Sequence, residues 1–159
     1  MSVSVLIEQS VLDGITDRSK SNRPNEAGGL LLGYRKGNDL HVVDLTGPLP
    51  MDVASPVRFF RKDPRHQRDA TRKWKGSRET LDWVGEWHSH PNGTPYPSSI
   101  DETTWRTQVR RRSVSMAYII SGANSHAVWL VDPLKLTVFP LCPIGADNSA
   151  TLFELSHSS

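Results

Sequence analysis

The sequence predicts a single α/β domain. Its 159 residues are enough for one hydrophobic core. Short apolar segments typical of strands alternate along the chain with longer segments that have helical spacing. The expected strands are 3–8, 27–34, 40–45, 57–61, 83–88, 116–120, 127–131 and 136–139, and the expected helices are 11–18, 65–80 and 98–111.

Local signals support most of these elements. Residues 3–8 alternate between apolar and polar, so they form a strand or lead into a helix that Ser10 can cap. A polar loop over 19–25 then brings Glu26 to the glycine-rich strand 27–34, where the glycines indicate a close approach of backbone or ligand. Residues after Cys142 are rich in serine and lack periodicity. We therefore expect the domain to span 1–142 and an extended or flexible tail to span 143–159.

Composition limits the class of protein. The formal charge of +2 is too small to indicate nucleic-acid binding by itself. Basic residues gather between Arg58 and Arg78, which indicates either a solvated helix face or a surface for an acidic partner. The single Cys142 excludes an internal disulfide framework and a CxxC site. The sequence has no long apolar run and no signal-peptide pattern, so a cytoplasmic location is expected.

The stretch 85–101, GEWHSHPNGTPYPSSID, carries the chemistry. His88 and His90 are two residues apart at the end of an expected strand, so their side chains point to the same side. The prolines and the glycine that follow require a turn, after which Ser98 can begin a helix with Asp101 in its first turn. Two imidazoles and one carboxylate are a three-ligand set for a catalytic zinc ion, with a fourth position open to water.

Less specific interpretations exist for each of these residues. A histidine pair alone is more often a surface or hydrogen-bonded feature, but the full HxHx7SxxD pattern is rare by chance and lies in a strand–loop–helix context. Ser98 could be a helix cap or a catalytic group, and Ser99 could take over the capping role. The sequence leaves that choice open.

His88, His90, Ser98 and Asp101 in this spacing resemble the JAMM motif of the JAB/MPN metalloprotease family. That motif also requires an upstream glutamate before a glycine-rich apolar strand, and Glu26 in NEAGGLLLG fits it. The segment GEWHSHP resembles the corresponding segment of the short prokaryotic JAB proteins. Those proteins accompany ubiquitin-transfer-like enzymes in antiphage operons, including the CBASS type. The resemblance implies a mixed sheet curved around helices, with Glu26 as general base and Ser98 as oxyanion stabiliser.

The resemblance also implies a function. It is zinc-dependent cleavage after the C-terminal tail of a ubiquitin-like or conjugated protein, such as a nucleotide-cyclising enzyme in antiviral defence. An extended tail would lie between the loop 92–97 and the segment 59–60. Three alternatives remain: an inactive MPN scaffold, a RadC-like DNA-associated protein, and the processing of a sulfur-carrier precursor.

Overall fold

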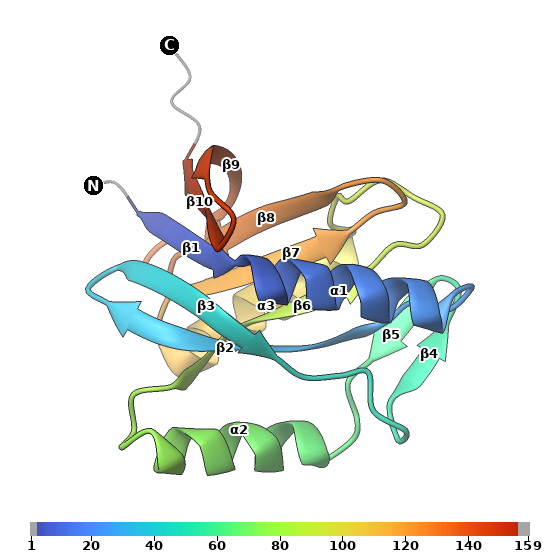
Figure 1. Cartoon of the computed structure of the whole chain (residues 1–159), viewed down its shortest axis with the longest axis horizontal. Coiled ribbons are helices and arrows are strands. Elements are labelled where there is room, and N and C mark those ends of the chain that lie inside the picture. Colours follow the sequence, from blue (N-terminus) through green and yellow to red (C-terminus); the bar gives the residue numbers. More distant parts are fainter. Residues whose placement is uncertain (1–2, 156–159) are drawn as a thin grey trace.

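The computed structural model describes residues 3–155 and forms one closed sheet with three helices packed on it (Figure 1). The bounds of its elements follow in chain order. They are β1 Ser4–Glu8, α1 Gln9–Asn22, β2 Gly28–Lys36, β3 Asp39–Leu45, β4 Val53–Ser55, β5 Arg58–Phe60, α2 Arg65–Gly76, β6 Asp82–Ser89, α3 Ser99–Arg112, β7 Met116–Ser121, β8 His126–Val131, β9 Val138–Ala146 and β10 Ala150–Leu155.

Eight strands close the sheet in the order β1-β10-β9-β8-β7-β6-β2-β3, while β4 and β5 form a separate two-stranded sheet. Most neighbours are antiparallel, but β6 pairs with β7 and β1 pairs with β3 in parallel. The expected mixed α/β fold is therefore confirmed. In the antiparallel β2–β6 pair, Gly28 lies opposite His88, which brings the residues just before β2 to the end of β6.

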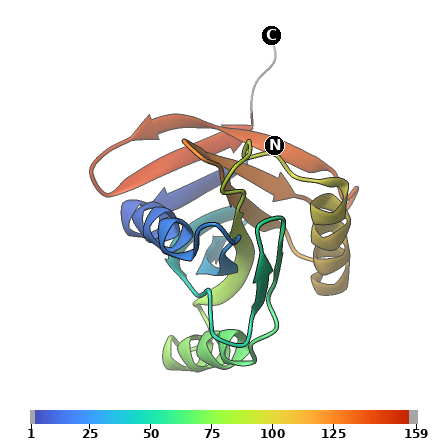
Figure 2. The same ribbon diagram turned by 90° about the vertical axis from the view of Figure 1, so that its right-hand side faces the viewer.

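The main core fills the concave side of this sheet. The apolar face of α1, with Val11, Leu12 and Ile15, packs there against the inward side chains of the strands, among them Leu31 and Trp87. Figure 2 shows α1 between the β9–β10 hairpin and the β2–β3 pair. Burying such side chains stabilises the fold by about 1.5–3 kcal/mol each.

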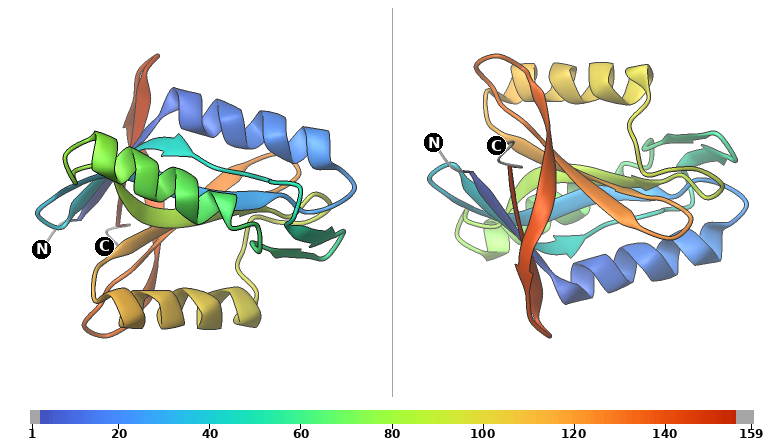
Figure 3. Two further views of the ribbon diagram at one scale, coloured as in Figure 1. Left: turned by 90° about the horizontal axis from the view of Figure 1, so that it is seen from below. Right: turned by 90° about the horizontal axis from the view of Figure 1, so that it is seen from above.

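The two other helices cover the opposite face of the sheet (Figure 3). Trp105 and Val109 of α3 pack on β7 and β8, with Trp105 stacked on Tyr118 at a ring separation of 4.5 Å. Ala70 of α2 packs on Leu30 and Leu32 of β2. Within residues 3–155, the structure contains no helix that is both long and apolar enough to cross a membrane.

Two helix boundaries differ from the prediction. α1 begins at Gln9 directly after β1 and runs through most of the expected loop to Asn22, and Ser10 lies inside it rather than capping it. Ser19 is buried on its packed face, so packing on the sheet extends the helix beyond its apolar residues. α2 ends at Gly76, because Arg78 and Glu79 adopt left-handed backbone conformations that no helix can contain.

The expected tail 143–159 is wrong for the residues that the structure describes. β9 continues to Ala146, and β10 pairs with β9 on one side and with β1 on the other. Phe153 of β10 is buried in the main core, so a domain boundary at 142 would remove part of that core. Pro140 and Pro143 lie within β9 and made its continuation hard to predict, and the register of the β9–β10 pair shifts beside Pro143. Residues 156–159 lie outside the described part.

Candidate metal centre

The end of β6 and the residues before β2 form the centre of the site. The β6 backbone continues past Ser89, where the N–H of His90 donates to Ser121 O of β7 at 2.7 Å. Ser89 N donates to Ala27 O at 2.9 Å, and Ala27 N donates to Ser89 Oγ at 2.8 Å. This double contact fixes Ala27, and with it Glu26, beside the two histidines.

The loop after β6 returns the chain to the histidines as the sequence predicted. Ser98 caps α3, because its Oγ accepts from Asp101 N at 3.1 Å while Asp101 Oδ2 accepts from Ser98 N at 2.8 Å. This reciprocal pair is a capping box. It resolves the choice between Ser98 and Ser99, and it uses only a lone pair of the Ser98 hydroxyl. Its proton stays available to a ligand.

Three side chains converge at distances suited to one metal ion. His88 Nε2 and His90 Nε2 are 3.0 Å apart, and Asp101 Oδ2 lies 3.3 Å from the first and 3.6 Å from the second. Tetrahedral ligands about 2.0–2.1 Å from a zinc ion are about 3.3 Å from one another. Nitrogen and oxygen donors at these separations therefore fit such an ion.

Glu26 lies at the edge of this cluster. Glu26, His88 and His90 each offer a ligand atom within 4.8 Å of the other two, and Glu26 Oε1 is 3.7 Å from His90 Nε2. Its carboxylate is buried, and this burial raises the pKa of Glu26 against the opposing effect of the two histidines. Glu26 is thus nearly as close to His90 as Asp101 is, at 3.6 Å, so distance alone does not separate a base from a ligand.

The histidine orientation is set by the loop. His90 Nδ1 lies 3.0 Å from Thr94 O, a carbonyl that can only accept, so this nitrogen carries the proton. Its Nε2 then keeps a lone pair toward the cluster, as a metal ligand requires. In the protonated ring Nε2 would instead donate to Asp101, and this hydrogen bond is the main cause of a raised His90 pKa. For Asp101, burial acts to raise the pKa, but hydrogen bonds from His88 and His90 outweigh it and lower the pKa.

A cleft of about 560 Å³ opens over these residues. The segment Val57–Arg61 lines one side, and Ile100, Thr104, Trp105 and Gln108 of α3 line the other. The expected wall at 59–60 is therefore present. The expected wall at 92–97 is not among the lining residues, and the Thr94 carbonyl of this loop contacts His90.

Comparison with known proteins places the chain in a family. A family model described as prokaryotic homologs of the JAB domain matches residues 8–131. The chain belongs to this family.

Relatives with curated names agree with this JAB assignment. A protein from Vibrio cholerae serotype O1 is 32% identical over 114 residues, which are 72% of this chain and 72% of the relative. A protein from Pseudomonas aeruginosa is 35% identical over 108 residues, 67% of this chain and 68% of its own. Both are named CD-NTase/cGAS isopeptidase. The solution structure of a protein from Desulfitobacterium hafniense shares the fold, with a TM-score of 0.63 at 24% identity over 87% of this chain and 88% of that one.

Two residues of this JAB domain escaped the sequence reasoning. Ser89 lies between the two histidines and is 1% exposed, and its hydroxyl accepts the Ala27 N–H. Ser55 of β4 accepts the Glu26 N–H through its carbonyl at 2.9 Å. The position of Ser89 between two candidate ligands could have indicated its contact with Ala27. The contact of Ser55 is a backbone contact between segments far apart in the chain, and no residue type indicates it.

Proposed function

We propose that this protein is a zinc-dependent isopeptidase that cleaves the amide bond after the C-terminal tail of a conjugated protein. The observation that carries the proposal is the convergence of His88, His90 and Asp101 at tetrahedral spacing, with Glu26 beside them in one open cleft. Membership of the JAB family and the isopeptidase names of its relatives support hydrolysis as the reaction.

His88, His90 and Asp101 are the proposed zinc ligands. Two imidazoles and one carboxylate with an open position are typical of catalytic zinc. Zinc held there would supply Lewis acidity to the amide carbonyl and to the attacking water. Thr94 O and the capping box of α3 hold two of the ligands in place before any metal binds, so little side-chain ordering remains to be done.

Glu26 and Ser98 are the proposed catalytic groups. The Glu26 carboxylate takes a proton from the attacking water and returns it to the nitrogen of the leaving amine. Ser98 donates its hydroxyl proton to the developing oxyanion. This donation is compatible with capping, because the cap uses only a lone pair of Oγ.

The cleft favours an extended substrate. β5 and α3 form its two sides, and an extended segment between them contacts several residues at once. Phe59 and Phe60 offer apolar surface there, and Arg58 adds a positive charge. These features fit a protein tail with a folded body beyond it better than a free dipeptide.

The names of the relatives guide the choice of partner. Because they refer to a CD-NTase, we propose that the tail belongs to a nucleotide-cyclising enzyme, which a ubiquitin-transfer-like enzyme attaches to its target. The cellular role would then be regulation of an antiphage response.

The test is cleavage of defined fusions. A nucleotide-cyclising enzyme of the same genome, extended at its C-terminus by a reporter protein, is incubated with the purified protein, and the products are identified by mass. A ubiquitin fusion and a sulfur-carrier fusion serve as comparison substrates. We expect release of the reporter at the last residue of the tail, loss of release with chelator, and recovery when zinc is restored. Chelator-insensitive release, or no cleavage of any fusion by a metal-loaded protein, would contradict the proposal.

A further inference from the structure

The segment between β3 and α2 leaves the closed sheet and carries the β4–β5 hairpin to the site. Its two strands pair only with each other, Val53 with Phe60 and Ser55 with Arg58. In Figure 1 the hairpin lies beyond one end of the large sheet, connected by the two arms of this segment. Something other than sheet pairing must therefore hold the hairpin in position.

The hairpin reaches the site at three points. Ser55 O accepts the Glu26 N–H at 2.9 Å. The ring of Phe59 fills the space beside Gly28, where an added Cβ would come within 2.5 Å of it. Arg61, just after β5, pairs with Glu86 of β6 at 2.8 Å. The position of the hairpin thus sets both the backbone of Glu26 and one side of the cleft.

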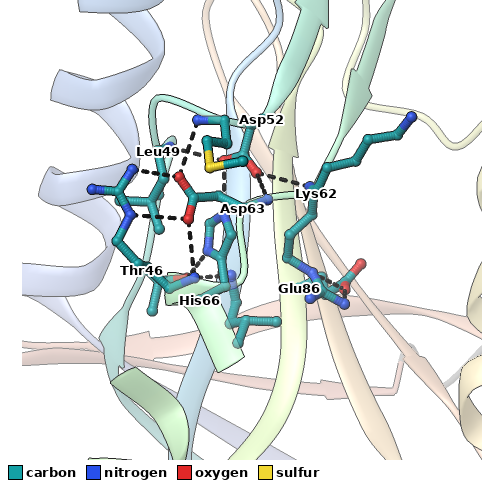
Figure 4. Close-up of polar contacts among 12 residues, drawn as sticks. Thr46, Leu49, Asp52, Lys62, Asp63, His66 and Glu86 are labelled. Atoms are coloured by element: carbon teal, nitrogen blue, oxygen red, sulfur yellow. Dashed lines mark hydrogen bonds and ion pairs between the residues drawn. The ribbon is translucent and has the colours of Figure 1, made fainter. Parts of the chain in front are cut away.

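The carboxylate of Asp52 makes most of the contacts that close the neck of this segment, where residues 49–52 meet residues 62–63. Asp52 Oδ2 accepts from Leu49 N at 2.8 Å and from His66 Nε2 at 2.6 Å, while Oδ1 accepts from Lys62 N at 2.9 Å and from Asp63 N at 3.0 Å (Figure 4). Leu49 lies before the hairpin, and Lys62 and Asp63 lie after it. The Asp52 side chain, which is only 2% exposed, therefore joins the two arms at four points, and Asp63 Oδ2 adds a fifth by accepting from Met51 N at 3.0 Å.

His66 connects this neck to the sheet. Its ring is fully buried, and Nδ1 lies 2.6 Å from Thr46 Oγ1 (Figure 4). Thr46 in turn accepts from Leu30 N of β2 through Oγ1 and from the Trp87 indole of β6 through its carbonyl, both at 2.9 Å. Trp87 is the neighbour of His88. A continuous set of hydrogen bonds thus runs from the neck to the strand that carries the metal ligands.

We infer that Asp52 is a positioning residue for the proposed peptidase: by closing the neck of 49–63 against His66, it holds the β4–β5 hairpin on Glu26 and sets the width of the substrate cleft. The inference rests on the proposed function for its consequence in catalysis. Asp52 does not line the cleft and is not among the metal-binding groups, so it acts only through the hairpin.

The test uses Asp52→Asn with Asp147→Asn as the matched control. Asparagine keeps the shape of the side chain, but its NH2 faces two of the four donors that the carboxylate accepted. Asp147 makes the same kind of contact in the β9–β10 turn, where it accepts from Ser149 N and Ala150 N. Both variants are loaded with zinc and assayed on a cleaved fusion.

We expect Asp52→Asn to keep its zinc, to lower kcat/KM by about 10- to 100-fold, and to raise KM as well as lower kcat. A variant that merely unfolds in part would lower kcat with the folded fraction and leave KM unchanged. Asp147→Asn should match the wild type in both constants. Loss of zinc from Asp52→Asn, unchanged kinetics, or a fall in kcat alone would each overturn the inference.

Amide hydrogen exchange of the wild type and of Asp52→Asn provides a second test that needs no active substrate. The amides of Glu26, Leu49, Lys62 and Asp63 should exchange together, as one unit that opens before the strands β2 and β6. In Asp52→Asn this unit should exchange faster while β2 and β6 remain protected. Independent exchange of these amides in the wild type would overturn the inference. If no fusion is cleaved, the proposed function fails, and exchange still decides whether Asp52 holds the hairpin.

Discussion

Replacing Glu26 by Gln is expected to stop hydrolysis while leaving the metal in place. The amide has the size of the carboxylate but cannot take a proton from water. The backbone contacts of Glu26, its N–H to Ser55 O and its carbonyl with Asn22 Nδ2, do not involve the side chain. His88, His90 and Asp101 should therefore keep their positions.

The structure and general kinetics set the size of the effect. A general base contributes a factor of about 10² to 10⁴ in rate, which corresponds to about 2.7–5.4 kcal/mol of transition-state stabilisation. The cost in folding stability should be much smaller. Among the described residues, the side chain of Glu26 forms no hydrogen bond, and its close polar neighbours are the two histidines, with His90 at 3.7 Å. Removing its buried charge should change the free energy of unfolding by less than about 1 kcal/mol.

The assay measures three quantities on the same samples: zinc per chain, the unfolding midpoint in urea, and kcat/KM on a cleaved fusion. Glu102→Gln is the matched control, because Glu102 follows Asp101 in the first turn of α3 and pairs with Arg106 instead of facing the cleft. We expect Glu102→Gln to behave as the wild type. A zinc-loaded Glu26→Gln protein that retains more than a third of the wild-type rate would remove Glu26 from the mechanism.

Three further outcomes are expected. His88→Ala should lose its bound zinc, since two remaining protein ligands are too few for a catalytic zinc site. Metal analysis checks this, and a zinc content equal to that of the wild type would disprove the ligand assignment. A full-length fusion should have at least about tenfold higher kcat/KM than a short peptide with the same junction. This advantage should shrink as the salt concentration rises if the basic residues of 58–78 contact the folded body of the substrate. Equal kcat/KM for the two substrates would exclude extended recognition. Burial lowers the pKa of His126, whose Nδ1 is buried without a hydrogen-bond partner. The contribution of neutral His126 to folding stability is therefore complete when the pH is above the ordinary pKa of 6.5, and it is lost as the pH falls below that value. Urea unfolding of the metal-free protein should therefore show a smaller loss between neutral and mildly acidic pH for His126→Gln than for the wild type, and equal losses would contradict this.

The fold was predictable where one face or both faces of an element are apolar. β7, with six buried residues in MAYIIS, has a continuous apolar run that is typical of a central strand. β10 was not predictable, because its stabilisation comes from pairing with β1, whose partner residues lie about 150 positions away. The same reason explains α1, whose last turns are held by the sheet rather than by their own sequence.

The site was predictable where its geometry is local. The interval from His88 to Asp101 contains a strand end, a turn and a helix start, and each has its own residue signals. Apart from Asn22, whose Nδ2 donates to the Glu26 carbonyl, the contacts that hold Glu26 are not local. They come from Ser89 and Ser55, on two different strands, and from the Asp52 neck behind the hairpin. A carboxylate and a buried histidine 14 residues apart gave no sign that they would meet.

The hydrogen bonds of the cluster separate the proposed ligands from the proposed base. His90 is oriented by Thr94 O on the side away from the cluster, and Asp101 Oδ2 accepts from the Ser98 N–H while it faces the two histidines, so each has a fixed partner within the protein. Fixed partners suit a metal ligand, which should not move during the reaction. Glu26 is held through its backbone alone, and within the described residues no donor is hydrogen-bonded to its carboxylate. A base must accept a proton and give it up again, and a carboxylate with unoccupied lone pairs in a buried place is free to do both. The division between ligands and base therefore follows from which of these side chains already have hydrogen-bond partners within the protein.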